Sequence, residues 1–142
     1  MDTISAGRLW SGRILSAVAV AFLLFDAAGK LMKVAPVIEG TVKLGYAESA
    51  VFPIGVLLLA GVLLYVIPRT SVLGAVYLAG YLGGAVATHF RVGSPLATHV
   101  LFPVYVAAFL WGGLALRNPR LVSLLTGARQ RGARSVERKI AP

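Results

Sequence analysis

The sequence predicts an all-α protein, a membrane-spanning four-helix bundle with a short interfacial helix between helices 1 and 2. Hydrophobic residues make up 58% of the 142 residues, charged residues only 13%, and the mean hydropathy is +0.82. Such values are typical of membrane proteins and not of soluble domains of this length. The apolar residues gather in four runs of roughly 20 residues, the length that spans a bilayer, and short polar segments separate them.

The first spanning helix is predicted over about residues 13–34, after a polar lead-in that contains Trp10. An aromatic ring there is typical of a membrane interface. A cleaved signal peptide is the alternative, but apolar residues resume after Asp26 and three more spans follow. Pro36 then suits a first helical turn and Gly45 a helix end, so a short amphipathic helix is predicted along the interface.

The other spanning helices are predicted over about residues 48–67, 71–90 and 95–116. Only a few residues join helices 2 and 3, which must therefore form an antiparallel hairpin. Gly80 and Gly84 in helix 3 are spaced for a close helix–helix contact inside this bundle, with a homodimer face as the alternative. Residues 1–126 thus form one transmembrane domain. The basic segment 127–142 lacks apolar periodicity and is predicted to be a disordered cytoplasmic tail.

The basic residues set the predicted orientation. Four spans place both termini on one side, where ten of the chain's 14 lysines and arginines lie, against four on the other side. The positive-inside rule then predicts that both termini are cytoplasmic. The net charge of +9 indicates anionic lipid headgroups as a partner, bound through the C-terminal tail, and not nucleic acid.

Several kinds of chemistry are excluded by the composition. The chain has no cysteine, so it has no disulfide, thiol relay or thiolate metal site. It also has no phosphate-binding loop and no nucleophile constellation, and no catalytic residue is assigned. A redox role would therefore need a bound cofactor or a partner protein.

A set of polar residues forms the candidate ligand-binding cluster. Asp26 and Lys30 lie four residues apart within the first apolar run, where an unpaired charge costs roughly 2.5–3.5 kcal/mol. The acid-first spacing allows the two to pair on one helix face. The predicted threading brings His89 and Arg91 from helix 3, and His99 from helix 4, to the same outer end of the bundle.

Three interpretations of this cluster are open. In the first it is a structural collar in which Lys30 or Arg91 neutralises Asp26. In the second it is a pocket at headgroup level, where Asp26 and a histidine exchange a proton with a small polar or quinone-like ligand. The third, a metal site at His89 and His99, is the weakest because no third ligand lies near them in the sequence, and no metal is predicted. Tyr77 and Tyr81 could extend a pocket inward.

Four stretches of the sequence, in order, are AGKLMK, KLGYAES, PRTSVLGAVYLAGYLGGAVATHFRVG and WGGLALR. Together they resemble the DoxX-like family of small bacterial four-helix membrane proteins, over about residues 14–117. The resemblance implies a four-helix bundle in the cytoplasmic membrane of a bacterium. The name-giving members are small membrane subunits associated with quinone-linked oxidation of sulfur compounds, and other relatives are tied to oxidative-stress complexes. His89 falls where such proteins commonly have a histidine, whereas Asp26 is less clearly a family feature.

These observations favour a membrane subunit or anchor that supports a quinone-linked or oxidative-stress redox complex. Such a subunit is favoured over an autonomous enzyme because no catalytic constellation is present. A small-solute transporter is a weaker alternative, since four helices are few and no broken helices occupy symmetric positions. A membrane assembly factor without catalysis is the other alternative.

Overall fold

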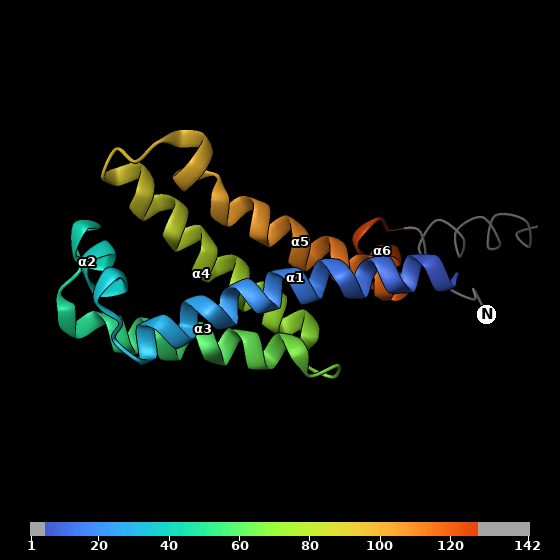
Figure 1. Cartoon of the computed structure of the whole chain (residues 1–142). Coiled ribbons are helices and arrows are strands. Elements are labelled where there is room, and N and C mark those ends of the chain that lie inside the picture. Colours follow the sequence, from blue (N-terminus) through green and yellow to red (C-terminus); the bar gives the residue numbers. More distant parts are fainter. Residues whose placement is uncertain (1–4, 128–142) are drawn as a thin grey trace, which may run out of the picture.

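The structure is a computed structural model, and it describes residues 5–127. This part of the chain is helical and contains no β-strand. Its elements are α1 (Ala6–Leu31), α2 (Ala35–Lys43), η1 (Glu48–Ala50), α3 (Val51–Val66), α4 (Ser71–Arg91), η2 (Leu96–Val100), α5 (Phe102–Arg117) and α6 (Pro119–Leu125) (Figure 1). Four segments are long and apolar enough to cross a membrane, namely α1, η1 with α3, α4, and η2 with α5. The predicted all-α four-helix bundle is confirmed.

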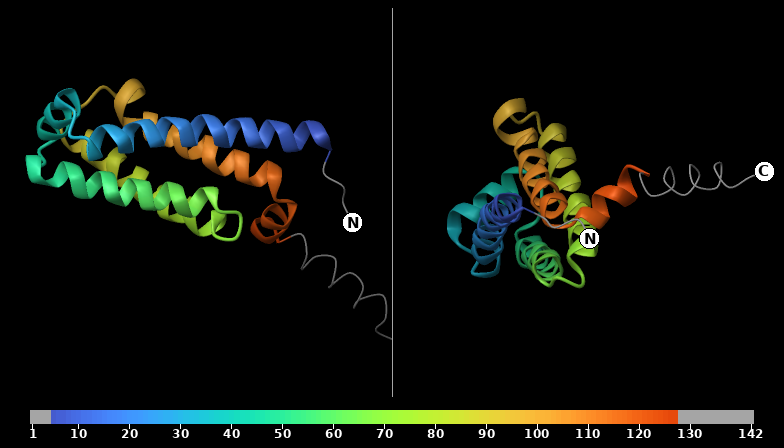
Figure 2. Two further views of the ribbon diagram at one scale, coloured as in Figure 1. Left: turned by 60° about the horizontal axis from the view of Figure 1, so that its bottom comes forward. Right: turned by 90° about the vertical axis from the view of Figure 1, so that its right-hand side faces the viewer.

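The four long helices pack as a ring of neighbours. α1 lies against α3 and α5, and α4 packs against the same two helices, so α1 and α4 are diagonal to each other. The N-terminal end of α1 and the short helix α6 lie at one end of the bundle, called here the terminal end (Figure 2). α2, the start of α3 and the α4–η2 connection lie at the opposite end, called the α2 end. The bundle is wider there (Figure 1).

α1 begins at Ala6, about two turns before the predicted start at residue 13. The polar lead-in is helical because Ser5 caps it, with its Oγ accepting a hydrogen bond from the Arg8 backbone N–H at 3.4 Å. The helix ends at Leu31, three residues before the predicted end, because the chain turns at Lys33, whose φ of 50° is left-handed.

The predicted short helix between helices 1 and 2 is present as α2. Pro36 stands in its first turn, where its missing N–H is tolerated. After α2 the chain turns at Gly45, whose φ of 89° favours glycine. A Cβ at Gly45 would also approach Arg91 Nη2 to 2.9 Å. This turn directs the chain from α2 back toward η1 and α3.

Small residues allow the closest helix contacts. At the crossing of α1 and α5, a Cβ added to Gly113 would lie 2.8 Å from the Gly12 carbonyl oxygen. At the crossing of α3 and α4, a Cβ added to Gly74 would overlap the backbone nitrogen of Tyr65. The core between these contacts holds the largest buried apolar side chains, among them Leu23, Leu58, Leu78 and Leu110.

The predicted close contact at Gly80 and Gly84 is wrong. Both glycines are exposed, and a Cβ added to either would have no atom of a neighbouring helix within 4 Å. α4 packs instead through a different face, on which Ser71, Gly74 and Leu78 are buried. The predicted C-terminal tail, beyond Gly127, lies outside the residues that the structure describes.

Candidate ligand-binding site

A cavity of about 890 Å³ lies within the wide α2 end of the bundle. Residues of α1, α2, α3, α4, η2 and α5 line it, so nearly every element of the bundle contributes. Its volume falls in the range of roughly 300–1,000 Å³ that is usual for sites of small molecules and cofactors. Much of the wall is apolar, including Phe22, Leu23, Ile54, Leu82, Phe102 and Val106.

The cavity is polar toward the α2 end and apolar toward the middle of the bundle. On α1, Lys30 and Asp26 lie near the α2 end and Leu23 lies deeper. On α4, His89 lies near the same end and Leu82 lies deeper. The cavity therefore has a polar region and an apolar region along its length.

Asp26 and Lys30 form an ion pair within one turn of α1. Lys30 Nζ donates a hydrogen bond to Asp26 Oδ1. The Lys30 side chain is 13% exposed and that of Asp26 is 32% exposed, and both residues line the cavity. The carboxylate is thus neutralised by the lysine that follows it by four residues. An ammonium group has three donors, so Lys30 can bind Asp26 and a ligand at the same time.

His89 and His99 face each other across the α4–η2 connection. Their ring centroids are 5.7 Å apart, and both residues line the cavity. His89 Nδ1 lies 3.1 Å from Ser94 Oγ, and His99 Nδ1 lies 2.8 Å from Thr98 Oγ1. Because each Nδ1 has a hydroxyl partner, Nε2 is the nitrogen that each ring can offer to a ligand.

Arg91 is the member of the predicted cluster that the structure does not bring into the cavity. Its Nη2 donates a hydrogen bond to the Leu44 carbonyl oxygen at 2.8 Å, which ties the end of α4 to the end of α2. Arg91 itself does not line the cavity, although the residues on either side of the α4 end, His89 and Val92, do.

The profile of the DoxX-like family matches residues 14–113. The chain belongs to the DoxX-like family. The match runs from α1 into α5, and it includes the residues that line the cavity. With its four apolar helices, this DoxX-like protein is a multi-pass integral membrane protein. Searches of curated proteins and of solved structures gave no significant match.

Tyr46, which the sequence did not single out, lines the cavity of this DoxX-like protein together with Thr88. Tyr46 Oη lies 2.9 Å from Thr88 Oγ1, and the Thr88 hydroxyl donates to the Gly84 carbonyl oxygen at 2.8 Å. The Tyr46 hydroxyl is therefore the donor to Thr88. Gly45 is the sequence feature that could have predicted the position of Tyr46. A glycine with a left-handed conformation after α2 turns the polypeptide back toward the bundle, and Tyr46 is the next residue.

The two tyrosines considered for an inward extension behave differently. Tyr81 lines the cavity. Tyr77 instead packs over Gly61 of α3, where a Cβ would lie 2.6 Å from Tyr77 Cδ1. Among residues 5–127, no group of three or more histidine, cysteine, aspartate and glutamate side chains could hold a metal ion. His89 and His99 therefore have no third protein ligand from this part of the chain.

A second polar network lies near the terminal end of the DoxX-like bundle and was not predicted. Tyr65 Oη bonds with Ser16 Oγ at 2.8 Å and donates to the Leu110 carbonyl oxygen at 2.7 Å. The Arg117 guanidinium donates to the same phenolic oxygen at 3.4 Å and to the Gly113 carbonyl oxygen at 3.2 Å. These groups satisfy one another, which is typical of a structural network in an apolar interior.

Proposed function

We propose that this DoxX-like protein is a membrane subunit that binds a quinone-like ligand in its cavity and supports a redox partner protein. The observation that carries the proposal is the cavity itself, with aromatic and aliphatic walls and with Lys30, His89 and His99 gathered at one end. A quinone needs apolar surfaces for its ring and hydrogen-bond donors for its carbonyl oxygens. Sites with a few polar groups in an otherwise apolar pocket are typical of such ligands.

The cavity residues take separate roles in this proposal. Phe22 and Phe102 both line the cavity, with ring centroids 4.9 Å apart in an edge-to-face arrangement, and they form an aromatic wall for the ring. Lys30 and a histidine Nε2 donate to the carbonyl oxygens. Asp26 and the histidines are the groups that can exchange protons with the ligand.

The electrons must come from another protein. Reduction of a quinone to a quinol consumes two electrons and two protons. The chain has no cysteine, and its side chains offer no thiol pair that could supply electrons. A redox partner protein therefore delivers them, and the DoxX-like subunit holds the acceptor and supplies protons.

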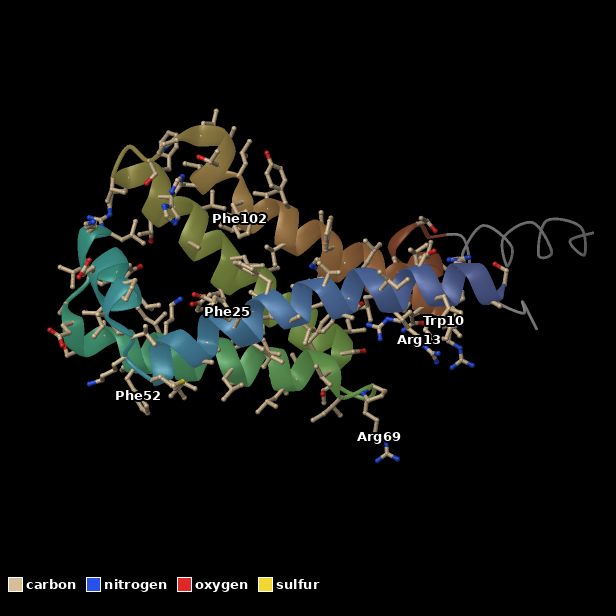
Figure 3. The ribbon with its side chains drawn as sticks, in the orientation of Figure 1. Trp10, Arg13, Phe25, Phe52, Arg69 and Phe102 are labelled. Carbon is tan, nitrogen blue, oxygen red and sulfur yellow. The ribbon has the colours of Figure 1, made fainter. Side chains whose placement is uncertain are left out.

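The proposal also includes an orientation in the cytoplasmic membrane of a bacterium, with both termini cytoplasmic. Basic residues support it, since Arg8, Arg13, Arg69, Arg117 and Arg120 belong to the terminal end of the bundle, and Figure 3 shows Trp10, Arg13 and Arg69 there. The basic tail 127–142 adds to this side in sequence and would bind anionic headgroups. The cavity then opens in the outer half of the membrane.

Quinone binding by the purified protein tests this function. The protein is placed in lipid nanodiscs, and binding of a short-chain benzoquinone is measured after correction for uptake by empty nanodiscs. His89→Ala should lose most of the binding. Phe90→Ala is the matched control, because Phe90 is the neighbouring residue on α4, is 73% exposed and does not line the cavity.

The paired charges give a second variant for the same test. Asp26→Asn with Lys30→Met removes both charges, and this variant should fold and yet fail to bind the quinone. Wild-type protein isolated in mild detergent should also carry a redox protein with it. The proposal is wrong if His89→Ala and the double variant both bind the quinone as the wild type does.

A further inference from the structure

Two exposed glycines form part of the wall that α4 contributes to the cavity. Gly80 and Gly84 line the cavity, and both residues are exposed. A Cβ added to either would have no atom of a neighbouring helix within 4 Å. The two glycines lie one turn apart on one face of the helix. At these two positions α4 contributes backbone and no side chain to the cavity wall.

The position of the two glycines matches the polarity of the cavity. Thr88 and His89 mark the polar region, and Gly80 lies about 12 Å from Thr88 along the helix axis, given a rise of 1.5 Å per residue. Leu82 and Val106 line the cavity at the depth of Gly80. A ligand whose head lies beside Lys30 and His89 would therefore have its other end in an apolar region beside the two exposed glycines.

We infer that the ligand is an amphiphile with one small polar head and one hydrocarbon chain, and that the chain leaves the cavity across Gly80 and Gly84. The chain passes from an apolar cavity into lipid chains of equal polarity, so its exit exposes no apolar surface to water. A second charged group on that end of the ligand would enter hydrocarbon and would be rejected. The inference rests on the proposed function only for the identity of the head.

Leucine substitutions on α4 test the path that the hydrocarbon chain of the ligand takes out of the cavity. Gly80→Leu puts a bulky side chain at the inferred exit, two turns from Thr88, and leaves the polar region unchanged. Gly83→Leu is the matched control, since Gly83 is also exposed with no atom near its Cβ but does not line the cavity. Leucine is a better helix former than glycine, so neither variant is expected to unfold.

Two probes with the same head separate head binding from chain binding. One is a methyl-substituted benzoquinone, and the other carries a decyl chain on the same ring. Binding is measured in nanodiscs, corrected for uptake by empty nanodiscs. Gly80→Leu should weaken the decyl probe at least tenfold and change the methyl probe less than twofold. Gly83→Leu should change neither probe by more than twofold.

A second pair of probes, decanoate and acetate, shows which proposal is wrong if the first test fails: the quinone-like head of the ligand, or the exit of its hydrocarbon chain across the glycines. If neither benzoquinone binds the wild type, the quinone-like head of the proposed function is wrong. The chain path is still supported in that case if decanoate binds more tightly than acetate and Gly80→Leu removes the difference. The path is overturned if no decyl chain strengthens binding, or if Gly80→Leu and Gly83→Leu act alike. It is also overturned if Gly80→Leu only dissociates a dimer, because a second copy then covers the glycines.

Discussion

The hydroxyl groups of Ser16 and Tyr65 lie 2.8 Å apart inside the bundle, and their hydrogen bond joins α1 to α3. Because Tyr65 donates its own proton to the Leu110 carbonyl oxygen, Ser16 is the donor to the phenolic oxygen. One phenol therefore links three of the four long helices, and Tyr65 is only 2% exposed. In an apolar interior such groups must find their partners within the protein.

Tyr65→Phe should destabilise the bundle by about 1–3 kcal/mol, since it leaves the Ser16 hydroxyl and the Arg117 guanidinium without this partner. Thermal unfolding in detergent measures the effect. Tyr77→Phe is the control, because the Tyr77 ring packs on Gly61 and its ring contacts are kept. Equal melting temperatures for the two variants would show that the Tyr65 network contributes nothing.

Gly74→Ala should lower the stability by about 3 kcal/mol, the upper end of typical overpacking costs. The added Cβ overlaps the backbone of Tyr65, and no side-chain rotation can relieve this clash. Gly83→Ala on the same helix meets no atom and should raise the stability, by up to about 1 kcal/mol, through helix propensity. Chemical unfolding of both variants checks the opposite signs.

Asp26→Asn should lower the melting temperature because Lys30 loses its partner inside the membrane span. The loss should be smaller than the about 3–5 kcal/mol of a fully buried pair, since Asp26 is 32% exposed. Adding Lys30→Met should recover much of the stability. A double variant less stable than Asp26→Asn alone would contradict this account of the pair.

Reporter fusions test the orientation. A reporter that works only in the cytoplasm should be active when fused after Gly127, and a reporter that works only outside should be active when inserted at Gly93. Gly93 lies in the exposed α4–η2 connection, with no atom within 4 Å of a Cβ, so an insertion there should be tolerated. The reverse pattern of activities would mean that the cavity opens toward the cytoplasm.

Much of the fold follows from local sequence patterns. The apolar runs give the spans, and Pro36 with Gly45 gives α2, because these signals act within a few residues. The ion pair of Asp26 and Lys30 is predictable for the same reason, since both residues lie on one turn of one helix. The meeting of His89 and His99 follows from the short connection between their helices.

Contacts between helices were harder to predict because they depend on how each helix is rotated. Gly80 and Gly84 have the spacing of packing glycines, yet α4 turns another face to its neighbours. Arg91 likewise bonds to the Leu44 carbonyl oxygen and does not line the cavity. Tyr65 was missed because nothing in its own segment reveals Ser16 and Arg117, which are 49 and 52 residues away.

The cavity occupies only the half of the bundle near α2, from Gly80 on α4 to Val92 just after that helix, and from Phe22 to Lys30 on α1. The inferred exit across Gly80 and Gly84 would therefore meet a single leaflet of the bilayer. Molecules in that leaflet can reach the cavity by lateral diffusion, whereas those in the opposite leaflet must first flip across. The occupancy of this protein would thus follow the composition of one monolayer and would change when a flippase moves its ligand between the two.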